Sequence, residues 1–213
     1  GSGVAGGLVG EVMGTLNIAN TYSVVTDPSY LQCNGLVGST PDPYYSGITL
    51  VSAQINVENS YGLAKSTNGS QLTFVQLMRV PITVTYKNVF VYDEYNSFKD
   101  VVGLISVTEE QLKNGTFANA LHLYKSETAD GSVWGQKVGT DEYPKLTGTI
   151  SGANVKISSL KFVTFDGDTA KYMDKYVEGV ETLLPATERQ GYVFKGWFSN
   201  KEYSGDSVLF IPK

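Results

Sequence analysis

Residues 7–22 form the stretch GLVGEVMGTLNIANTY, and both of its ends recur further along the chain. The first four residues, Gly-Leu-Val-Gly, return at 35–38, which is a shift of 28 positions. The last three, at 20–22, are Asn-Thr-Tyr and return as Asn-Ser-Tyr at 59–61, a shift of 39. The two shifts agree if the second copy carries about 11 additional residues. The Pro-rich segment 39–47 is the expected place for this insertion, as a loop.

The spacing of small and apolar residues within the repeat predicts stacked β coils. Glycines permit tight corners, and the Leu and Val between them fill an interior. Leu16 and Ile18 alternate along a short strand, and Ile55 and Val57 take the same places in the second copy. One coil cannot bury its own apolar face, whereas stacked coils can. The sequence therefore predicts a short right-handed β-solenoid.

The overall composition fits a mainly β protein and disfavours several functional classes. Hydrophobic residues make up 41% of the chain, which is enough to build a core, and turn-forming Gly and strand-favouring Tyr are abundant. Because the net charge is −5 and the basic residues are scattered, a nucleic-acid-binding face is not expected. No apolar run approaches the roughly 18 residues of a membrane span. The single Cys and single His exclude an internal disulfide and disfavour a Cys/His metal site.

Residues 108–124 change to a helical period. Thr108 and Gln111 form a capping-box pattern, which predicts a short helix that ends near Asn114. A second short helix is predicted from apolar residues at helical spacing: Phe117, Ala120, Leu121 and Tyr124. We expect these helices to belong to a cap, since an open stack of coils needs one against edge-to-edge association.

Two segments in this part of the chain resemble one known family. Residues 6–22, GGLVG followed by GTL and NTY, resemble the GLUG motif of large secreted or surface-anchored bacterial proteins. The second copy matches less well, because Asn34 stands where the motif has its first Gly. Residues 133–146, VWGQKVGTDEYPKL, resemble the ending that closes GLUG-containing regions. The resemblance implies β-helical coils with residues 133–146 as their terminal cap.

The C-terminal residues 160–213 resemble a second family. After VTFD at 163–166, the stretch LPATERQGYVFKGWF at 184–198 is similar to the Listeria–Bacteroides repeat, also called the internalin B-type repeat. This family implies a small β-grasp-like fold. The repeat usually ends in a further strand, whereas this sequence stops at Lys213, so we interpret the last strand as missing and expect a frayed edge there.

These segments divide the chain into three parts. Residues 1–150 are expected to form the GLUG-type solenoid region with its cap. Residues 151–159 are expected to be a linker or a last rung, and residues 160–213 the repeat that lacks its last strand.

The Tyr-rich insertion is the best candidate for a ligand-binding loop. Insertions in a coil lie on one face and often carry function. Tyr44 and Tyr45 offer contact area and hydroxyl groups at low entropic cost. A plain connecting loop is the alternative interpretation. No residue is assigned a catalytic, cofactor-binding or metal-ligating role.

The remaining aromatic side chains are interpreted as structural. Tyr192, Phe194 and Trp197 alternate as a sugar-stacking platform would, but we expect them to form the core of a small domain that has little else to bury. Trp134 is expected to pack within the cap. Cys33 is interpreted as a small buried filler, with intermolecular pairing as the alternative.

The ionisable residues also receive structural interpretations. Asp166 and Asp168 with Glu178 could ligate Ca²⁺, but the spacing of a calcium loop is not continued, so a surface turn is favoured. His122 is expected to be a solvated helix residue.

Two pairs of adjacent acids are not expected to be catalytic. On a strand Asp141 and Glu142 would point to opposite faces and could not flank one glycosidic bond. Glu109 and Glu110 place negative charge at a helix N-terminus.

Taken with the resemblances, these features predict a non-enzymatic extracellular module at the surface or cell wall of a bacterium. It would act in adhesion or ligand binding, or as a structural stalk, with a host glycoprotein, a polysaccharide or a cell-wall component as partner. Two alternatives are an accessory carbohydrate- or protein-binding module of a larger secreted peptidase or glycosidase, and direct catalysis by clustered carboxylates.

Overall fold

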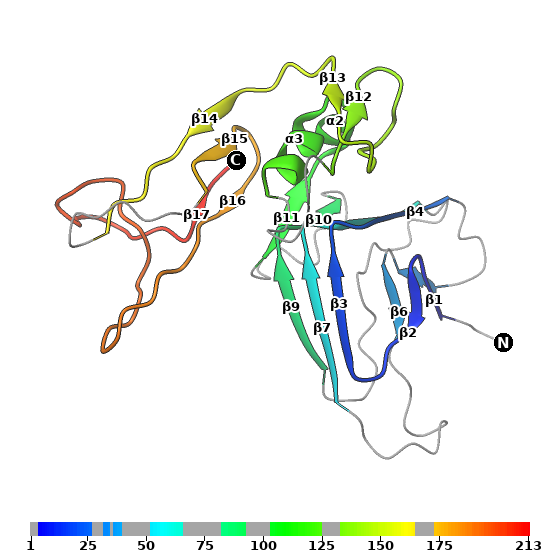
Figure 1. Cartoon of the computed structure of the whole chain (residues 1–213), viewed down its shortest axis with the longest axis horizontal. Helices are drawn as coiled ribbons and strands as arrows, with labels where there is room; N and C mark the ends of the chain where they lie inside the picture. Colours follow the sequence, from blue (N-terminus) through cyan, green and yellow to red (C-terminus); the bar gives the residue numbers. More distant parts are fainter. Residues whose placement is uncertain are drawn as a thin grey trace.

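The computed structural model describes residues 4–26, 32–34, 36–39, 52–65, 82–92, 103–124, 133–164 and 173–213 of the chain (Figure 1). Among these residues strands outnumber helices and form several small sheets, which confirms the prediction of a mainly β protein.

Three rungs of strands stack in parallel in the N-terminal half. The first rung contains β1 (Val4–Gly6), β2 (Val9–Glu11), β3 (Thr15–Ala19) and β4 (Tyr22–Thr26). The second contains β5 (Gln32–Asn34), β6 (Val37–Ser39), β7 (Ala53–Glu58) and β8 (Tyr61–Lys65). The third contains β9 (Ile82–Lys87) and β10 (Val89–Tyr92). Each strand of the first rung pairs in parallel with its counterpart in the second, and β7 and β8 pair in parallel with β9 and β10.

The register of these pairs follows the repeat in the sequence. Val9 lies opposite Val37, a shift of 28, while Tyr22 lies opposite Tyr61, a shift of 39. The repeated segments therefore stack directly on one another. The shift changes between β6 and β7, which places the insertion where the Pro-rich segment predicts it.

The third rung has no counterpart among the repeats that the sequence shows. Asn88-Val89-Phe90 lies one rung below Asn59-Ser60-Tyr61, with Phe90 opposite Tyr61. It keeps the corner Asn and an aromatic residue but has Val in place of the hydroxyl residue. The corner Asn is thus present in all three rungs, whereas the complete Asn-[Ser/Thr]-Tyr motif is present only in the first two.

The inner faces of the rungs form a hydrophobic cluster. Leu36, Val37, Ile55 and Val89 have no exposed surface, and Val57 is 2% exposed. Val84 and Tyr86 pack against the cluster from the third rung. Alternation along β7 explains this arrangement, because every second side chain points inward.

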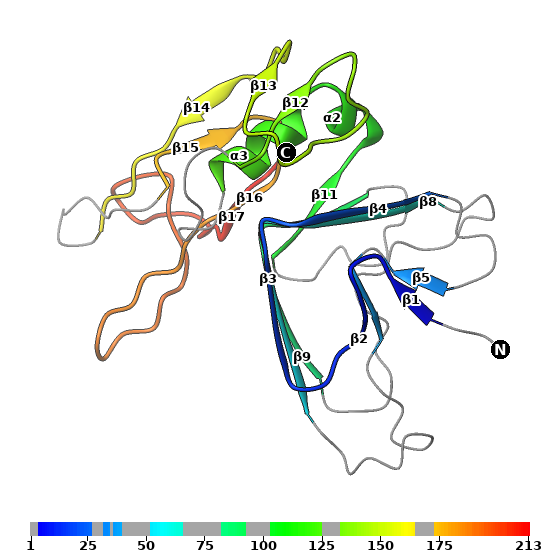
Figure 2. The same ribbon diagram turned by 45° about the vertical axis from the view of Figure 1, so that its right-hand side comes forward.

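A strand and two helices cover β10 of the third rung. β11 (Leu104–Val107) pairs in parallel with β10 and leads into α2 (Glu109–Lys113) and α3 (Thr116–Leu123) (Figure 2). The predicted capping box is confirmed: Gln111 N donates to Thr108 Oγ1 at 3.2 Å, and Thr108 N donates to Gln111 Oε1 at 2.8 Å. The second predicted helix is confirmed as α3, whose buried side chains include Phe117 and Leu121.

The remaining strands are short and pair locally. β12 (Gln136–Lys137) pairs in parallel with β13 (Ile150–Ser151). β14 (Ile157–Ser159) pairs antiparallel with β15 (Lys175–Val177), and β16 (Thr182–Leu183) with β17 (Phe210–Ile211). The frayed edge expected near the C-terminus is therefore not observed for β17.

The C-terminal strands pack against the helices. Val177 and Val180 belong to the same hydrophobic cluster as Phe117 of α3. Two polar contacts join the same parts: Gln111 Nε2 donates to Gly179 O at 2.7 Å, and the hydroxyl oxygens of Tyr124 and Thr182 are 2.7 Å apart. These contacts connect residues on both sides of the expected boundary at 151–159, which stays a prediction.

Candidate binding face and its supports

The outer face of the sheet β3–β7–β9 carries three rows of polar side chains, which we call the polar face. Each row crosses the three strands in register: Thr15, Gln54 and Thr83; Asn17, Asn56 and Thr85; Ala19, Glu58 and Lys87. Asn56 and Glu58 are half-buried and the other side chains are exposed. Because both flanking strands pair in parallel with β7, these side chains lie directly beside one another.

Neighbouring side chains of the polar face hold one another in place. Asn56 Nδ2 donates to Asn17 Oδ1 at 2.8 Å, and Lys87 Nζ lies 2.7 Å from Glu58 Oε1. Within the described residues, Asn17 Nδ2 and the hydroxyls of Thr83 and Thr85 make no further hydrogen bond. The face thus presents oriented donors and acceptors that remain available to a ligand.

An asparagine ladder forms the corner where each rung turns from one sheet into the next. Asn20, Asn59 and Asn88 have φ values of 49°, 43° and 52°. Asn tolerates this left-handed conformation better than most residues do. Asn59 Nδ2 donates to Asn20 Oδ1 at 2.7 Å and to the carbonyl of Leu121 in α3 at 2.9 Å. The ladder therefore joins the first two rungs to the cap.

The hydroxyl residue that follows the corner Asn explains the Asn-[Ser/Thr] pattern. Thr21 Oγ1 donates to Ala19 O at 2.9 Å, and Ser60 Oγ donates to Glu58 O at 2.7 Å. Ser60 Oγ also accepts from Thr21 N at 3.1 Å, so one hydroxyl closes its own turn and links two rungs.

The aromatic residue of the repeat stacks beneath the cap. The rings of Tyr22 and Tyr61 are 5.4 Å apart and nearly parallel, and Trp134 lies 5.6 Å from Tyr61. The Tyr61 hydroxyl donates to the carbonyl of Pro144. Burial, together with the nearby Tyr22 and Tyr143, raises the pKa of Tyr61, so this tyrosine stays neutral and acts as a donor.

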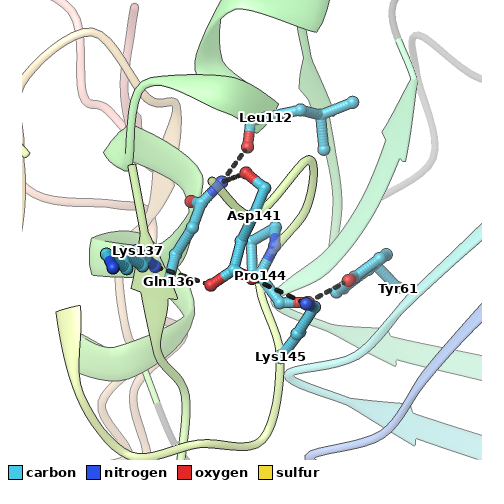
Figure 3. A network of polar contacts seen from close by, with 7 residues as sticks. All are labelled: Tyr61, Leu112, Gln136, Lys137, Asp141, Pro144 and Lys145. Atoms are coloured by element: carbon cyan, nitrogen blue, oxygen red, sulfur yellow. Dashed lines mark hydrogen bonds and ion pairs between the residues drawn. The ribbon is translucent and has the colours of Figure 1, made fainter. Parts of the chain in front are cut away.

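Residues 133–146 are held by a network of polar contacts (Figure 3). Gln136 Nε2 donates to Leu112 O at 2.8 Å, which satisfies a carbonyl at the end of α2. Asp141 Oδ2 accepts from Lys137 N at 2.7 Å, and its Oδ1 lies 2.6 Å from Lys145 Nζ. The hydrogen bond from Lys145, followed by that from Lys137, lowers the pKa of the Asp141 carboxyl. Together with the contact from Tyr61 to the Pro144 carbonyl, this arrangement gives Asp141 and Pro144 structural roles.

Two buried residues of this segment, Trp134 and Gly135, are closely packed. Trp134 has no exposed surface, which confirms its predicted packing in the cap. Gly135 lies against the strand that follows, where an added Cβ would be 2.4 Å from Thr149 O.

The two acid pairs are engaged in local contacts. Asp141 and Glu142 lie in a turn and not on a strand, and Glu142 accepts from the Tyr143 hydroxyl at 2.7 Å. The prediction that a strand turns these two acids to opposite faces is therefore wrong, and each acid instead has its own local partner. Glu109 and Glu110 occupy the first turn of α2 as predicted, with Glu109 2.6 Å from Lys113 Nζ.

Of the other interpretations from the sequence, that of His122 changes. His122 is half-buried, with Nδ1 3.2 Å from Trp134 O, and is not the solvated residue predicted. Glu178 lies 2.8 Å from Lys156 Nζ, while Asp166 and Asp168 are outside the described residues. Cys33 lies in β5, and the description does not extend to its side chain.

The predicted aromatic core of the C-terminal part is only partly present. Trp197 and Phe194 are half-buried, their rings are 5.5 Å apart, and Trp197 Nε1 donates to Pro185 O at 2.8 Å. Tyr192 is 69% exposed, so its assignment to the core is wrong. Its ring instead lies 4.6 Å from the Arg189 guanidinium at a surface turn.

The predicted ligand-binding residues Tyr44 and Tyr45 lie outside the described residues, in the segment that leads into β7. The polar face was not among the sites predicted from the sequence. Its signal was present as the polar residues that alternate with the apolar ones at the same shift of 39: Thr15, Asn17, Gln54 and Asn56.

The described residues show neither a candidate metal site nor a candidate membrane-spanning helix. They contain no group of three or more His, Cys, Asp or Glu side chains placed to hold a metal ion. None of the described helices has the length and apolar character needed to cross a membrane.

Comparison of the whole chain with protein-family models, curated proteins and solved structures gave no match.

Proposed function

We propose that this chain is a non-enzymatic binding module or stalk of a secreted or cell-surface bacterial protein. Its fold would be a short right-handed β-solenoid with a helical cap, followed by a β-grasp-like module at 160–213. Parallel rungs at the two shifts of the repeat support the solenoid. The similarity of residues 6–22 to the GLUG motif supports the extracellular location.

The polar face is the observation that carries the binding role. Its hydroxyl and amide groups lie in rows on an open surface, whereas small-molecule sites are concave and mostly apolar. An extended ligand with many hydroxyl groups could match such rows with several hydrogen bonds at once. A polysaccharide, the glycan of a host glycoprotein or a cell-wall component has this chemistry.

The side chains of the polar face are held in place before any ligand binds. Asn17 and Asn56 are fixed by their mutual hydrogen bond, and the corner ladder ties the rungs to α3. Side chains that are ordered before binding lose less entropy when a ligand arrives. This favours recognition by weak contacts repeated along a surface.

A binding assay on immobilised mucin, peptidoglycan and plant and bacterial polysaccharides tests the proposal. We expect the full chain to retain at least one of these ligands. The double variant Asn17→Ala/Thr85→Ala should weaken that binding about tenfold, since each lost hydrogen bond contributes about 0.5–1.5 kcal/mol. Asn154→Ala is the matched control, because Asn154 is exposed and does not belong to β3, β7 or β9, the strands that form the polar face.

The outcomes separate the possible roles. Retention that is unaffected by the double variant but lost in Tyr44→Ala/Tyr45→Ala would move the site to the insertion. Absence of binding to every ligand would favour a stalk. Turnover of a glycoside or peptide by the purified chain would overturn the non-enzymatic role.

A further inference from the structure

The polar face offers both hydrogen-bond donors and acceptors. Gln54 Nε2 donates weakly to Asn56 Oδ1 at 3.5 Å, and Asn56 Nδ2 donates in turn to Asn17 Oδ1 at 2.8 Å. Within the described part of the chain, these bonds leave the amide hydrogens of Asn17 free at one end and the amide oxygen of Gln54 free at the other. The hydroxyl of Thr85, next to Asn56, can donate or accept. A ligand that matches the face therefore needs groups that do both, as hydroxyl groups do.

The charges on the polar face already balance each other. Among the residues of its three rows, Glu58 and Lys87 alone are charged, and Lys87 Nζ lies 2.7 Å from Glu58 Oε1. The lysine side chain is 63% exposed and the glutamate side chain 28%. A carboxylate, sulfate or phosphate of a ligand that approached Lys87 would come close to the carboxylate of Glu58, and like charges side by side are unfavourable. The face therefore disfavours anionic ligands, and the net charge of −5 on the whole chain acts in the same direction.

The rows of the polar face repeat at the spacing of neighbouring strands, which is about 4.8 Å. β3, β7 and β9 lie side by side, so each row places one side chain on each of the three strands (Figure 1). In a glycan with β-(1→4) linkages the chain is extended, and its sugar rings follow one another at close to this spacing. In a glycan with α-(1→4) linkages the chain coils away from a straight line. Only the extended chain keeps its rings in step with the strands.

We propose that the polar face selects an uncharged, extended, β-linked glycan that lies across β3, β7 and β9 with one sugar ring at each strand. This inference rests on the binding role proposed above and specifies the class of its ligand. The hydroxyl groups of each ring would exchange hydrogen bonds with the row at Thr15, Gln54 and Thr83 and with the row at Asn17, Asn56 and Thr85. Acidic polysaccharides and coiled α-glucans would bind more weakly.

A glycan array probed with the full chain tests the inference. The array contains oligomers of mannan, cellulose, xylan and chitin, which are uncharged and β-(1→4)-linked. Two of them have matched partners. Polymannuronate has the ring configuration and linkage of mannan but carries a carboxylate on each ring, and malto-oligosaccharides contain the sugar of cellulose with α linkages. We expect an uncharged β-linked glycan to bind at least about tenfold more tightly than any acidic or α-linked one, with little dependence on salt.

The variant Glu58→Gln tests the role of charge in this preference. It leaves Lys87 without its partner, so the preference for uncharged over acidic glycans should narrow by at least about fivefold. Glu188→Gln is the matched control, because it removes the same charge from an exposed residue of the C-terminal part. Its preference should equal that of the native chain. Far-UV circular dichroism checks that both variants keep their fold.

The outcomes distinguish this inference from the proposed binding role. Tightest binding to an acidic or an α-linked glycan would overturn the inference and leave the binding role in place. Equal narrowing of the preference in Glu58→Gln and Glu188→Gln would also overturn it, since the net charge of the chain and not the polar face would then set the preference. Absence of binding to every glycan would contradict the binding role itself, and the inference with it.

Discussion

Residues 52–65 of the second rung and residues 185–213 near the C-terminus both consist of short strands and turns, yet only the first group has an interior. Ile55, Val57 and Tyr61 are at most 2% exposed. Among residues 185–213, all of which are described, no side chain is buried, and several large apolar ones are exposed: Tyr192, Val193, Tyr203, Val208, Leu209 and Phe210. The second rung has a rung on each side, whereas the C-terminal segment occurs once. Repetition thus supplies cover that a short single segment cannot provide.

The largest expected effect is a difference between the two tryptophans in the stability that is lost when each is replaced by Ala. Trp134 has no exposed surface and packs on Tyr61, so Trp134→Ala should reduce the free energy of unfolding by about 3–5 kcal/mol. Trp197 is half-buried, and Trp197→Ala should cost only about 1–2 kcal/mol. Urea unfolding followed by circular dichroism measures both values. An equal or larger loss in Trp197→Ala would break the comparison, because it would mean that the C-terminal part depends on burial as strongly as the rungs do.

A smaller effect is expected at Gly135. A Cβ at this position would lie 2.4 Å from Thr149 O, which is backbone and cannot move aside easily. Gly135→Ala should therefore reduce the free energy of unfolding by about 1–3 kcal/mol. Gly10→Ala is the control, since a Cβ there meets nothing within 4 Å. Similar unfolding curves for the two variants would show that the backbone around Gly135 shifts easily to accommodate an added methyl group.

The smallest effect concerns acid stability. The Lys145 hydrogen bond lowers the pKa of Asp141, and contacts with Lys156 and then Ser158 lower that of Glu178. A carboxyl whose pKa is lower in the folded state stabilises the protein above its unfolded pKa, and this contribution disappears as the pH falls through the folded pKa. Asp141→Asn and Glu178→Gln should each reduce the loss of stability below about pH 4.

Thermal unfolding midpoints measured between about pH 7 and about pH 2 test this expectation. Because the two carboxylates lie in different parts of the chain, the measurement also compares those parts. If only Asp141→Asn changes the profile, the acid sensitivity belongs to the cap. Profiles identical to that of the native chain in both variants would contradict the assigned ion pairs.

Much of the rung structure could be predicted from the sequence, because stacking in register requires equivalent residues at a fixed shift. Asn20-Thr21-Tyr22 and Asn59-Ser60-Tyr61 show that shift directly. The third rung was not predicted, since Asn88-Val89-Phe90 keeps the corner and the ring but lacks the hydroxyl. The pairing of β9 with β7 and of Phe90 with Tyr61 identifies it as an equivalent of the others.

The candidate sites were harder to predict, because burial depends on what lies opposite a side chain. Tyr192 has the alternation of a core aromatic residue, but it lies at a surface turn where the rest of the chain leaves it mostly exposed. The polar face follows from the same alternation that predicts the core, yet single exposed Asn and Thr residues carry no signal until the register places them side by side. The capping box of α2 could be predicted from the sequence, because Thr108 and Gln111, which form it, lie within a few residues of each other.

The order of the rungs has a consequence for the rate and route of folding. β10 and β11 pair residues that are 15 positions apart, such as Val89 and Leu104, whereas β3 and β7 pair residues 39 positions apart. Closing a longer loop costs more chain entropy, and contacts between distant residues slow folding. The helices and β11 should therefore form the nucleus on which the third rung assembles. The second and first rungs would follow in turn, so the chain would fold from its middle toward its N-terminus.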